Sequence, residues 1–259
     1  MTIALTHTFI LTGRQLRAAS RFPAFLVMNL VQPVIWLLLF GQLFKSVVEI
    51  PGFGSGQSYL EFLTPGIVMM MALFGSAWSG TVYIQDMHRG VMDRFLTSPT
   101  SRPAMIVSTL IYQSLLAIVQ SLIVIGIAWL AGARFSGGLT GILILLLAVV
   151  LLTAIFCSLS NAAALLAREQ TVLIGISQLI TLPLMFLSSA IMNTSLSPEW
   201  VQNVAKYNPF EWAVVVGREA LSASPDWGTI WVHVGLLSAL TVVMAALATS
   251  AFRVYQRSA

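Results

Sequence analysis

The densest cluster of charged side chains in this sequence starts at Asp86 and lies between two apolar stretches. Asp86 and Arg89 are three positions apart and Arg89 and Asp93 are four apart, which are the spacings of ion pairs on one helix. The alternative is a solvated loop that only follows the positive-inside rule, but such a loop would not need an amphipathic helix bracketed by prolines, so we favour a docking element. We expect a short amphipathic docking helix over about 86–98, ended by proline-containing turns. Arg94 adds a charge to this helix, and Phe95 and Leu96 belong to its apolar side. Pro99 and Arg102 follow it.

A second unusual segment, about 198–222, contains two helix starts. Ser197-Pro198-Glu199 and Asn208-Pro209-Phe210-Glu211 each combine an N-cap residue, a proline and an acid of the first turn. Helices of about ten residues are too short to cross a membrane. Both are rich in aromatic residues such as Trp212, and the pair Glu211 and Arg218 lies near the edge of the apolar part. We expect a re-entrant or interfacial hairpin on the outer side.

Nothing in the sequence suits catalysis. It has no glycine-rich phosphate-binding loop that ends in Lys-Ser or Lys-Thr. The three histidines have no metal-ligand spacing, and a single cysteine, Cys157, excludes a disulfide framework and a cysteine-rich metal site. We therefore expect a non-catalytic chain with no catalytic residues and no cofactor or metal of its own, and we set aside an intramembrane enzyme.

The composition indicates an integral membrane protein. Charged residues make up 8% of the 259 residues, whereas a soluble domain has about 25%. Hydrophobic residues make up 58% and the mean hydropathy is +0.89, which excludes a soluble enzyme and a disordered chain. About 20 apolar residues cross a bilayer as a helix. We expect an all-α protein with six transmembrane helices, at about 24–44, 62–84, 104–131, 140–164, 171–192 and 228–251.

The basic residues predict the orientation of these spans. Nine Lys and Arg residues lie on the side of both termini and four on the other side, so both termini should be cytoplasmic. Residues 1–22 should form an interfacial helix that directs Arg14, Arg17 and Arg21 toward lipid headgroups and water. No basic patch with interleaved aromatic residues indicates nucleic-acid binding.

Two features leave alternatives open. Gly137 and Gly141 have the spacing of a helix-packing motif, but at the head of the fourth span we expect a loop rather than a dimer face. The alternative class of protein is a six-span secondary transporter or channel. Ion-coupled carriers typically place ionisable groups within their spans, whereas these spans lack charge and Glu61 lies only near the outer edge.

The order of these segments resembles the permease subunits of ABC-2 type exporters over about residues 5–257. The pattern Asp86-x-x-Arg89-Gly90-x-x-Asp93-Arg94-Phe95-Leu96-x-x-Pro99-x-x-Arg102 resembles the coupling helix, with Val91 and Asp93 where Thr and Glu are usual. Asn208-Pro209 with Arg218 resembles the family's Asn-Pro segment, with Trp212 where His, Tyr or Arg is common. The start of the second span resembles the family through Tyr59, Glu61, Phe62, Pro65 and Gly66.

The resemblance implies that residues 23–256 form an ABC transmembrane type-2 domain. It implies a bacterial inner (plasma) membrane, a second permease, identical or paralogous, and separate ATPase subunits that bind ATP and Mg. The coupling helix would then sit in a groove of the ATPase, with Phe95 and Leu96 filling that groove. The closest branch by resemblance exports drugs and antibiotics, and charge-free spans suit an amphipathic or lipid-like cargo. The alternative branch exports polysaccharides or lipid-linked glycans.

Overall fold

The computed structural model describes residues 2–21, 23–44, 58–92, 102–191 and 197–257, and all regular structure in these ranges is helical. The helices are α1 (Thr2–Ser20), α2 (Pro23–Leu43), α3 (Tyr59–Ala77), α4 (Thr81–His88), α6 (Arg102–Leu130), α7 (Gly138–Ala167), α8 (Gln170–Phe186), α9 (Glu199–Ala205), α10 (Pro209–Leu221) and α11 (Trp227–Arg257).

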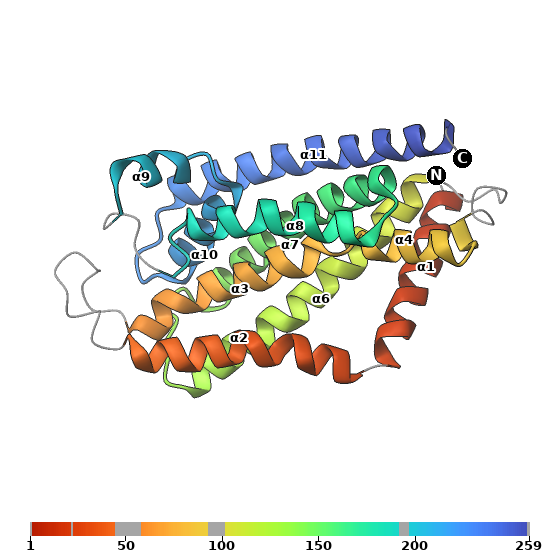
Figure 1. Cartoon of the computed structure of the whole chain (residues 1–259). Coiled ribbons are helices and arrows are strands. Elements are labelled where there is room, and N and C mark those ends of the chain that lie inside the picture. Colours follow the sequence, from red (N-terminus) through yellow and green to blue (C-terminus); the bar gives the residue numbers. More distant parts are fainter. Residues whose placement is uncertain (1, 22, 45–57, 93–101, 192–196, 258–259) are drawn as a thin grey trace.

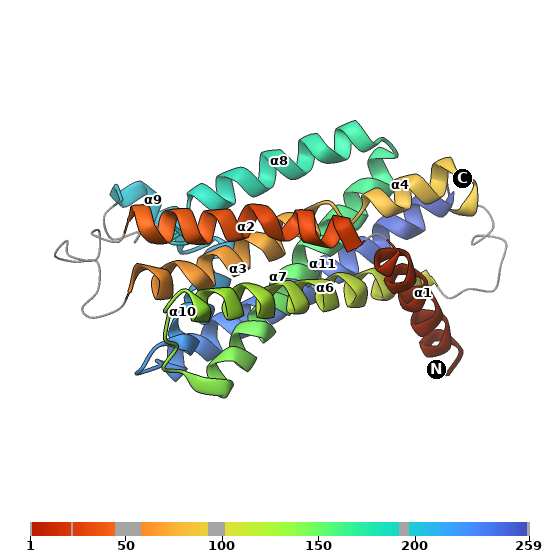
Figure 2. The same ribbon diagram turned by 90° about the horizontal axis from the view of Figure 1, so that it is seen from below.

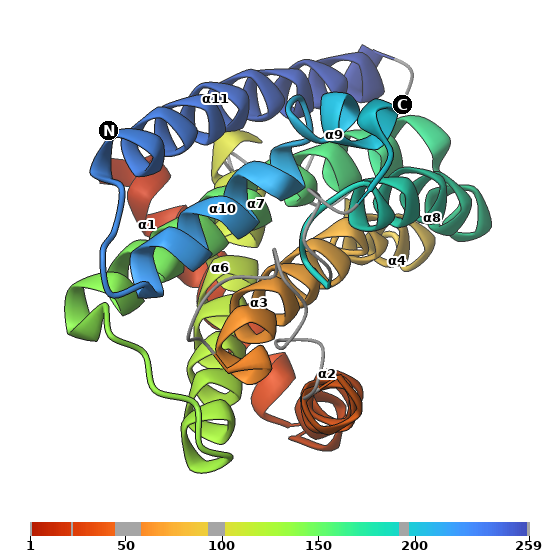
Figure 3. The ribbon, with the colours of Figure 1, turned by 90° about the vertical axis from the view of Figure 1, so that its left-hand side faces the viewer.

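The long helices run side by side along one axis, and α1 crosses one end of the bundle (Figures 1 and 2). Helix α7 is the centre of the packing and contacts α11, α10, α3, α6 and α8. It is apolar on all sides, and its Leu145, Leu152 and Val149 are completely buried, whereas Leu143 on another face is exposed. Figure 3 views the bundle from the end that carries α9 and α10, with α11 and α2 on opposite sides.

Four stretches within the described residues are long and apolar enough to cross a membrane. They are Tyr59–His88, Ala104–Leu130, Gly138–Ala167 and Trp227–Arg253. Two shorter apolar helices, Val27–Leu43 and Gln170–Phe186, occupy the first and fifth of the expected positions. The protein is therefore an all-α, multi-pass membrane protein.

Several helix boundaries differ from the sequence-based expectation. The second expected span, 62–84, is divided between α3 and α4, and α11 ends at Arg257 instead of about 251. The helix that contains Asp86 does not continue to 98, because α4 ends at His88 and Gly90 has a φ of +65°, a conformation that glycine adopts without strain. Helix α8 ends at Phe186 instead of about 192. Near this end Ser188 donates its hydroxyl to the Met185 carbonyl at 2.6 Å. The five residues after α8, 187–191, are non-helical.

Candidate functional site

The first group of candidate residues lies where α1, α4 and α6 meet, at the end of the bundle that carries both termini (Figure 1). Arg14 Nη2 of α1 donates to Asp86 Oδ2 of α4 at 3.0 Å. The Asp86 side chain is 13% exposed and the Arg14 side chain 42% exposed. The expected ion pair between Asp86 and Arg89 is therefore replaced by one to a different helix. Arg14 therefore binds α4 while a large part of its side chain stays exposed.

Polar contacts extend this junction into α6. Tyr83 Oη and Thr109 Oγ1 are 3.1 Å apart, and Thr12 Oγ1 donates to the Ser108 carbonyl at 3.5 Å. A small cavity lies between the three helices, and Arg14, Tyr83 and Thr109 are among its lining residues. The contacts attach α1 and α4 to the first turns of α6.

The structure describes only some of the predicted docking residues. Arg89 is the exposed C-cap of α4, and Gly90 follows it in the left-handed conformation. The backbone of Arg102 begins α6. The predicted residues that lie outside the described ranges are Asp93, Arg94, Phe95, Leu96 and Pro99.

The second group lies at the opposite end of the bundle and centres on Arg218 of α10. Its Nη1 donates to Ser189 Oγ at 2.9 Å and its Nη2 to the Ser189 carbonyl at 2.9 Å. Nη2 also donates to the Phe62 carbonyl at 3.4 Å, and the guanidinium lies 3.8 Å from the centre of the Phe62 ring. One arginine thereby connects α10, α3 and the segment 187–191.

Asn208 and Glu211 also bind the region after α8. Asn208 Nδ2 donates to the carbonyls of Leu184 and Leu187 at 2.7 and 2.8 Å, while its Oδ1 accepts from Phe210 N–H at 2.9 Å. Asn208 is thus the N-cap of α10 and also a partner for the last carbonyls of α8, which an isolated helix end leaves unpaired. Glu211 Oε2 accepts from the Ser189 N–H at 2.6 Å. Pro209 occupies the first turn of α10, as expected.

The start of α3 contacts the same segment. Tyr59 Oη donates to the Ile191 carbonyl at 3.1 Å. Gly66 approaches the backbone so closely that a Cβ there would lie 2.1 Å from the Ala190 oxygen. The structure therefore brings two sequence motifs, 59–66 and 208–218, together on residues 187–191.

Other predicted residues at this end have local roles. Glu61 Oε2 accepts from Ser58 N–H at 3.1 Å in a capping box, and its Oε1 accepts from Arg134 N–H at 2.8 Å. Trp212 Nε1 donates to the Lys206 carbonyl at 2.8 Å. Pro65 is a buried residue within α3.

Sequence reasoning missed two features of this end. Ser189, the common partner of Glu211 and Arg218, was not among the candidates, although the run Ser188-Ser189-Ala190 of small residues was a visible cue. Gly137 and Gly141 pack against α10: a Cβ at either position would lie 2.0 or 2.1 Å from the Ala220 oxygen. The expected loop is therefore the N-terminal end of α7, packed against α10 of the same chain.

Comparison with known proteins identifies related sequences. Residues 6–221 match the model of the family described as ABC-2 type transporter. The chain is 26% identical to the daunorubicin resistance ABC transporter permease protein DrrB1 of Streptomyces coeruleorubidus, over 98% of this chain and 87% of that protein. It is 31% identical to the putative transport permease ycf38 of Porphyra purpurea, over 80% of this chain and 70% of that protein. The probable doxorubicin resistance permease DrrC of Mycobacterium tuberculosis is 20% identical over 85% of this chain and 79% of its own length. The chain belongs to the ABC-2 type transporter family.

Proposed function

We propose that the chain is the permease subunit of an ATP-driven exporter that moves an amphipathic, drug-like or lipid-like substrate outward. The family match over residues 6–221 carries this proposal. Two relatives whose names refer to daunorubicin and doxorubicin resistance support a drug-like substrate. ATP and Mg would bind to separate ATPase subunits, and a second permease, identical or paralogous, would complete the membrane part.

In this proposal the segment 86–102 contacts the ATPase. Its support is local: α4 ends at the exposed Arg89, at the same end of the bundle as the exposed Arg14 and Arg17 of α1. The residues assigned to coupling are Asp86, Arg89, Gly90, Asp93, Arg94, Phe95, Leu96, Pro99 and Arg102. Asp86 would act indirectly, by attaching α4 to α1.

We also propose six spans in a bacterial inner membrane, with cytoplasmic termini and α1 in the interface. The two shorter apolar helices, within α2 and α8, would complete the six. Helices α1 and α11 place both ends of the chain at one end of the bundle, as an even number of crossings requires (Figure 1). The opposite end has exposed tryptophans of the kind found at membrane–water interfaces: Trp129, Trp200, Trp227 and Trp231.

Affinity purification of the tagged chain from its own membrane, with mass spectrometry of the partners, tests this function first. The expected result is co-purification of an ABC ATPase. The complex, reconstituted in inside-out proteoliposomes, should accumulate daunorubicin only when ATP is present. Uptake driven by a proton gradient without ATP would instead indicate a secondary transporter and contradict the proposal.

A further inference from the structure

The second span is interrupted by a turn at Trp78, Ser79 and Gly80, between α3 and α4. Here hydrogen bonds join residues three positions apart, instead of four as in an α-helix. Ser79 N–H donates to the Ser76 carbonyl and Thr81 N–H to the Trp78 carbonyl, each at 3.1 Å. Lipid offers no hydrogen bonds, so an interrupted span needs partners from neighbouring helices.

Side chains of two other helices supply those partners. Gly80 N–H donates to Ser160 Oγ of α7 at 3.0 Å. The Ala77 carbonyl accepts from Ser177 Oγ of α8 at 2.8 Å. Ser79 Oγ donates to Asn161 Oδ1 of α7 at 3.3 Å. The backbone groups on both sides of the interruption are therefore paired with hydroxyl groups of α7 and α8.

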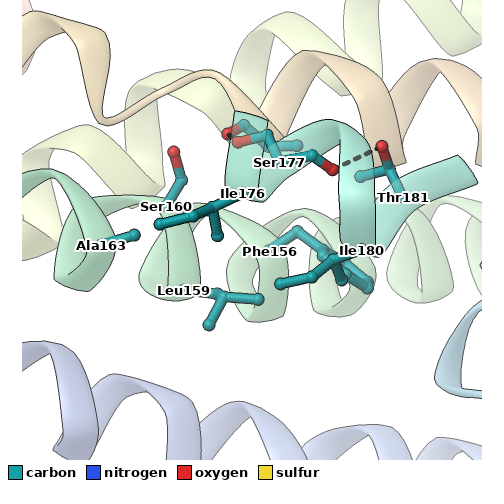
Figure 4. Close-up of a pocket in the computed structure, with 9 residues that line it drawn as sticks. Phe156, Leu159, Ser160, Ala163, Ile176, Ser177, Ile180 and Thr181 are labelled. Atoms are coloured by element: carbon teal, nitrogen blue, oxygen red, sulfur yellow. Dashed lines mark hydrogen bonds between the residues drawn. The ribbon is translucent and has the colours of Figure 1, made fainter. Parts of the chain in front are cut away.

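The turn is close-packed on one side and has space on another. A Cβ at Gly80 would lie 2.4 Å from the Ser160 carbonyl oxygen, so α7 and the turn are in close contact. Beside this contact, between α7 and α8, lies a small cavity lined by Ala77, Ser160, Ser177 and Phe156, among others (Figure 4).

The helices on the two sides of the turn are held differently. Most of α3 is buried in the core, with Leu63 and Leu73 completely buried. In α4 only Tyr83 and Ile84 are buried, and Asp86 attaches it to α1. The turn thus separates a fixed outer half of the span from a short inner half that leads to the segment proposed to bind the ATPase.

We propose that the turn at residues 78–80 is a joint, about which α4 moves together with α1 and the attached first turns of α6 relative to α3 when the ATPase subunits close. Ser160 and Ser177 hold the joint in the arrangement seen here, and its movement separates Ser79 from α7. This inference depends on the proposed function in one respect: the partner ATPase would supply the energy for the movement.

A disulfide across the joint tests this movement. The Ser79 hydroxyl lies 3.5 Å from the Cys157 carbonyl, and it shares the Asn161 amide with the Cys157 thiol, at 3.3 and 3.7 Å. Cys157 is the single cysteine of the chain. Ser79→Cys therefore places a thiol beside the native one. Copper phenanthroline oxidises the pair, and maleimide-polyethylene glycol added after denaturation reports the thiols that remain free.

The oxidised S79C complex should lose daunorubicin transport by about tenfold or more, and dithiothreitol should restore it, because conformational steps often limit turnover. The matched control, S79C with Cys157→Ala, should not respond to the oxidant. A fully bridged chain that transports as fast as the reduced one would overturn the joint.

A pair of glycine variants tests the joint without cross-linking. Gly80→Ala adds a methyl group against Ser160, while Gly75→Ala, in α3, meets no atom within 4 Å. G80A should slow transport about fivefold or more and leave ATPase co-purification intact, whereas G75A should match the unmodified chain. Equal transport by the two variants would contradict the joint. If the proposed function itself were wrong, the result would be different, because even the unmodified chain would show no ATP-dependent transport.

Discussion

Glu211 and Arg218 bind the same residue, Ser189, through different atoms. Glu211 Oε2 accepts from the Ser189 N–H at 2.6 Å, and Arg218 donates to the hydroxyl and carbonyl of Ser189 at 2.9 Å each. Glu211 is 8% exposed, so both charges act in a largely buried setting. Hydrogen bonds to charged groups are stronger than neutral ones, so Glu211 and Arg218 together hold Ser189 firmly.

Replacing Arg218 should loosen this end even when the charge is kept. Arg218→Lys keeps a cation near the Phe62 ring but loses the planar fork that donates to Ser189 twice. We expect R218K to lower the free energy of unfolding by about 2 kcal/mol and R218M by about 3 kcal/mol. Denaturation in mixed SDS micelles measures both. An R218K variant as stable as the unmodified chain would show that the fork is unimportant.

A methyl group at Gly66 should displace the segment that Ser189 belongs to. The added Cβ would lie 2.1 Å from the Ala190 oxygen, and overpacking of this kind costs about 1–3 kcal/mol. Gly126→Ala, in α6, is the matched control because its Cβ meets no atom within 4 Å. Thermal melting in detergent should show a lower Tm for G66A and an unchanged or higher Tm for G126A. The reverse order would contradict the close approach.

The contact between Arg14 and Asp86 should contribute modestly to stability. Since the Arg14 side chain is 42% exposed, we expect a coupling energy of about 0.2–1 kcal/mol from a double-mutant cycle. The cycle consists of R14A, D86A and the double variant, all measured by denaturation. Salt should weaken the coupling, because ions screen exposed pairs. A coupling energy of zero at low salt would mean that the pair does not hold α1 to α4.

Charge reversal in the docking segment should uncouple the transporter without unfolding it. In the double variant R89D/D93R, substrate-dependent ATP hydrolysis and daunorubicin transport should both fall about tenfold or more, because a like-charge contact opposes docking. Lys206→Asp is the control, since Lys206 is exposed and lies between α9 and α10, at the end of the helix bundle opposite the docking segment. Normal coupled transport by R89D/D93R would exclude this segment as the ATPase contact.

The positions of the helices were largely predictable from charge and hydropathy. The start of α10 at Asn208-Pro209 follows from local sequence rules, and the structure confirms it. Among the described residues, four of the six expected apolar stretches are helices long enough to cross a membrane, and shorter apolar helices occupy the other two positions. The end of α8 was not predictable in this way. An apolar run appeared to continue to about 192, but Asn208, 21 positions beyond Leu187, binds the last carbonyls instead.

Contacts between distant segments account for the other differences. The spacing of Asp86 and Arg89 favoured a local pair, whereas the observed partner, Arg14, is 72 positions away on a separate helix. Gly90 should have signalled the end of α4, because glycine is common just after a helix. Ser189 matters because segments that are distant in sequence meet around it. The spacing of residues within one segment cannot predict such a contact.

The contact of Gly137 and Gly141 with the Ala220 carbonyl has a consequence for protein engineering. The depth at which α10 is seated depends on two positions that lack a side chain, and Gly137 N–H also donates to the Leu221 carbonyl at 3.2 Å. Small substitutions at 137 and 141 would lift α10 by graded amounts without changing any residue that α10 itself presents. A library limited to these two codons is therefore a compact way to vary how closely α10 packs against α7.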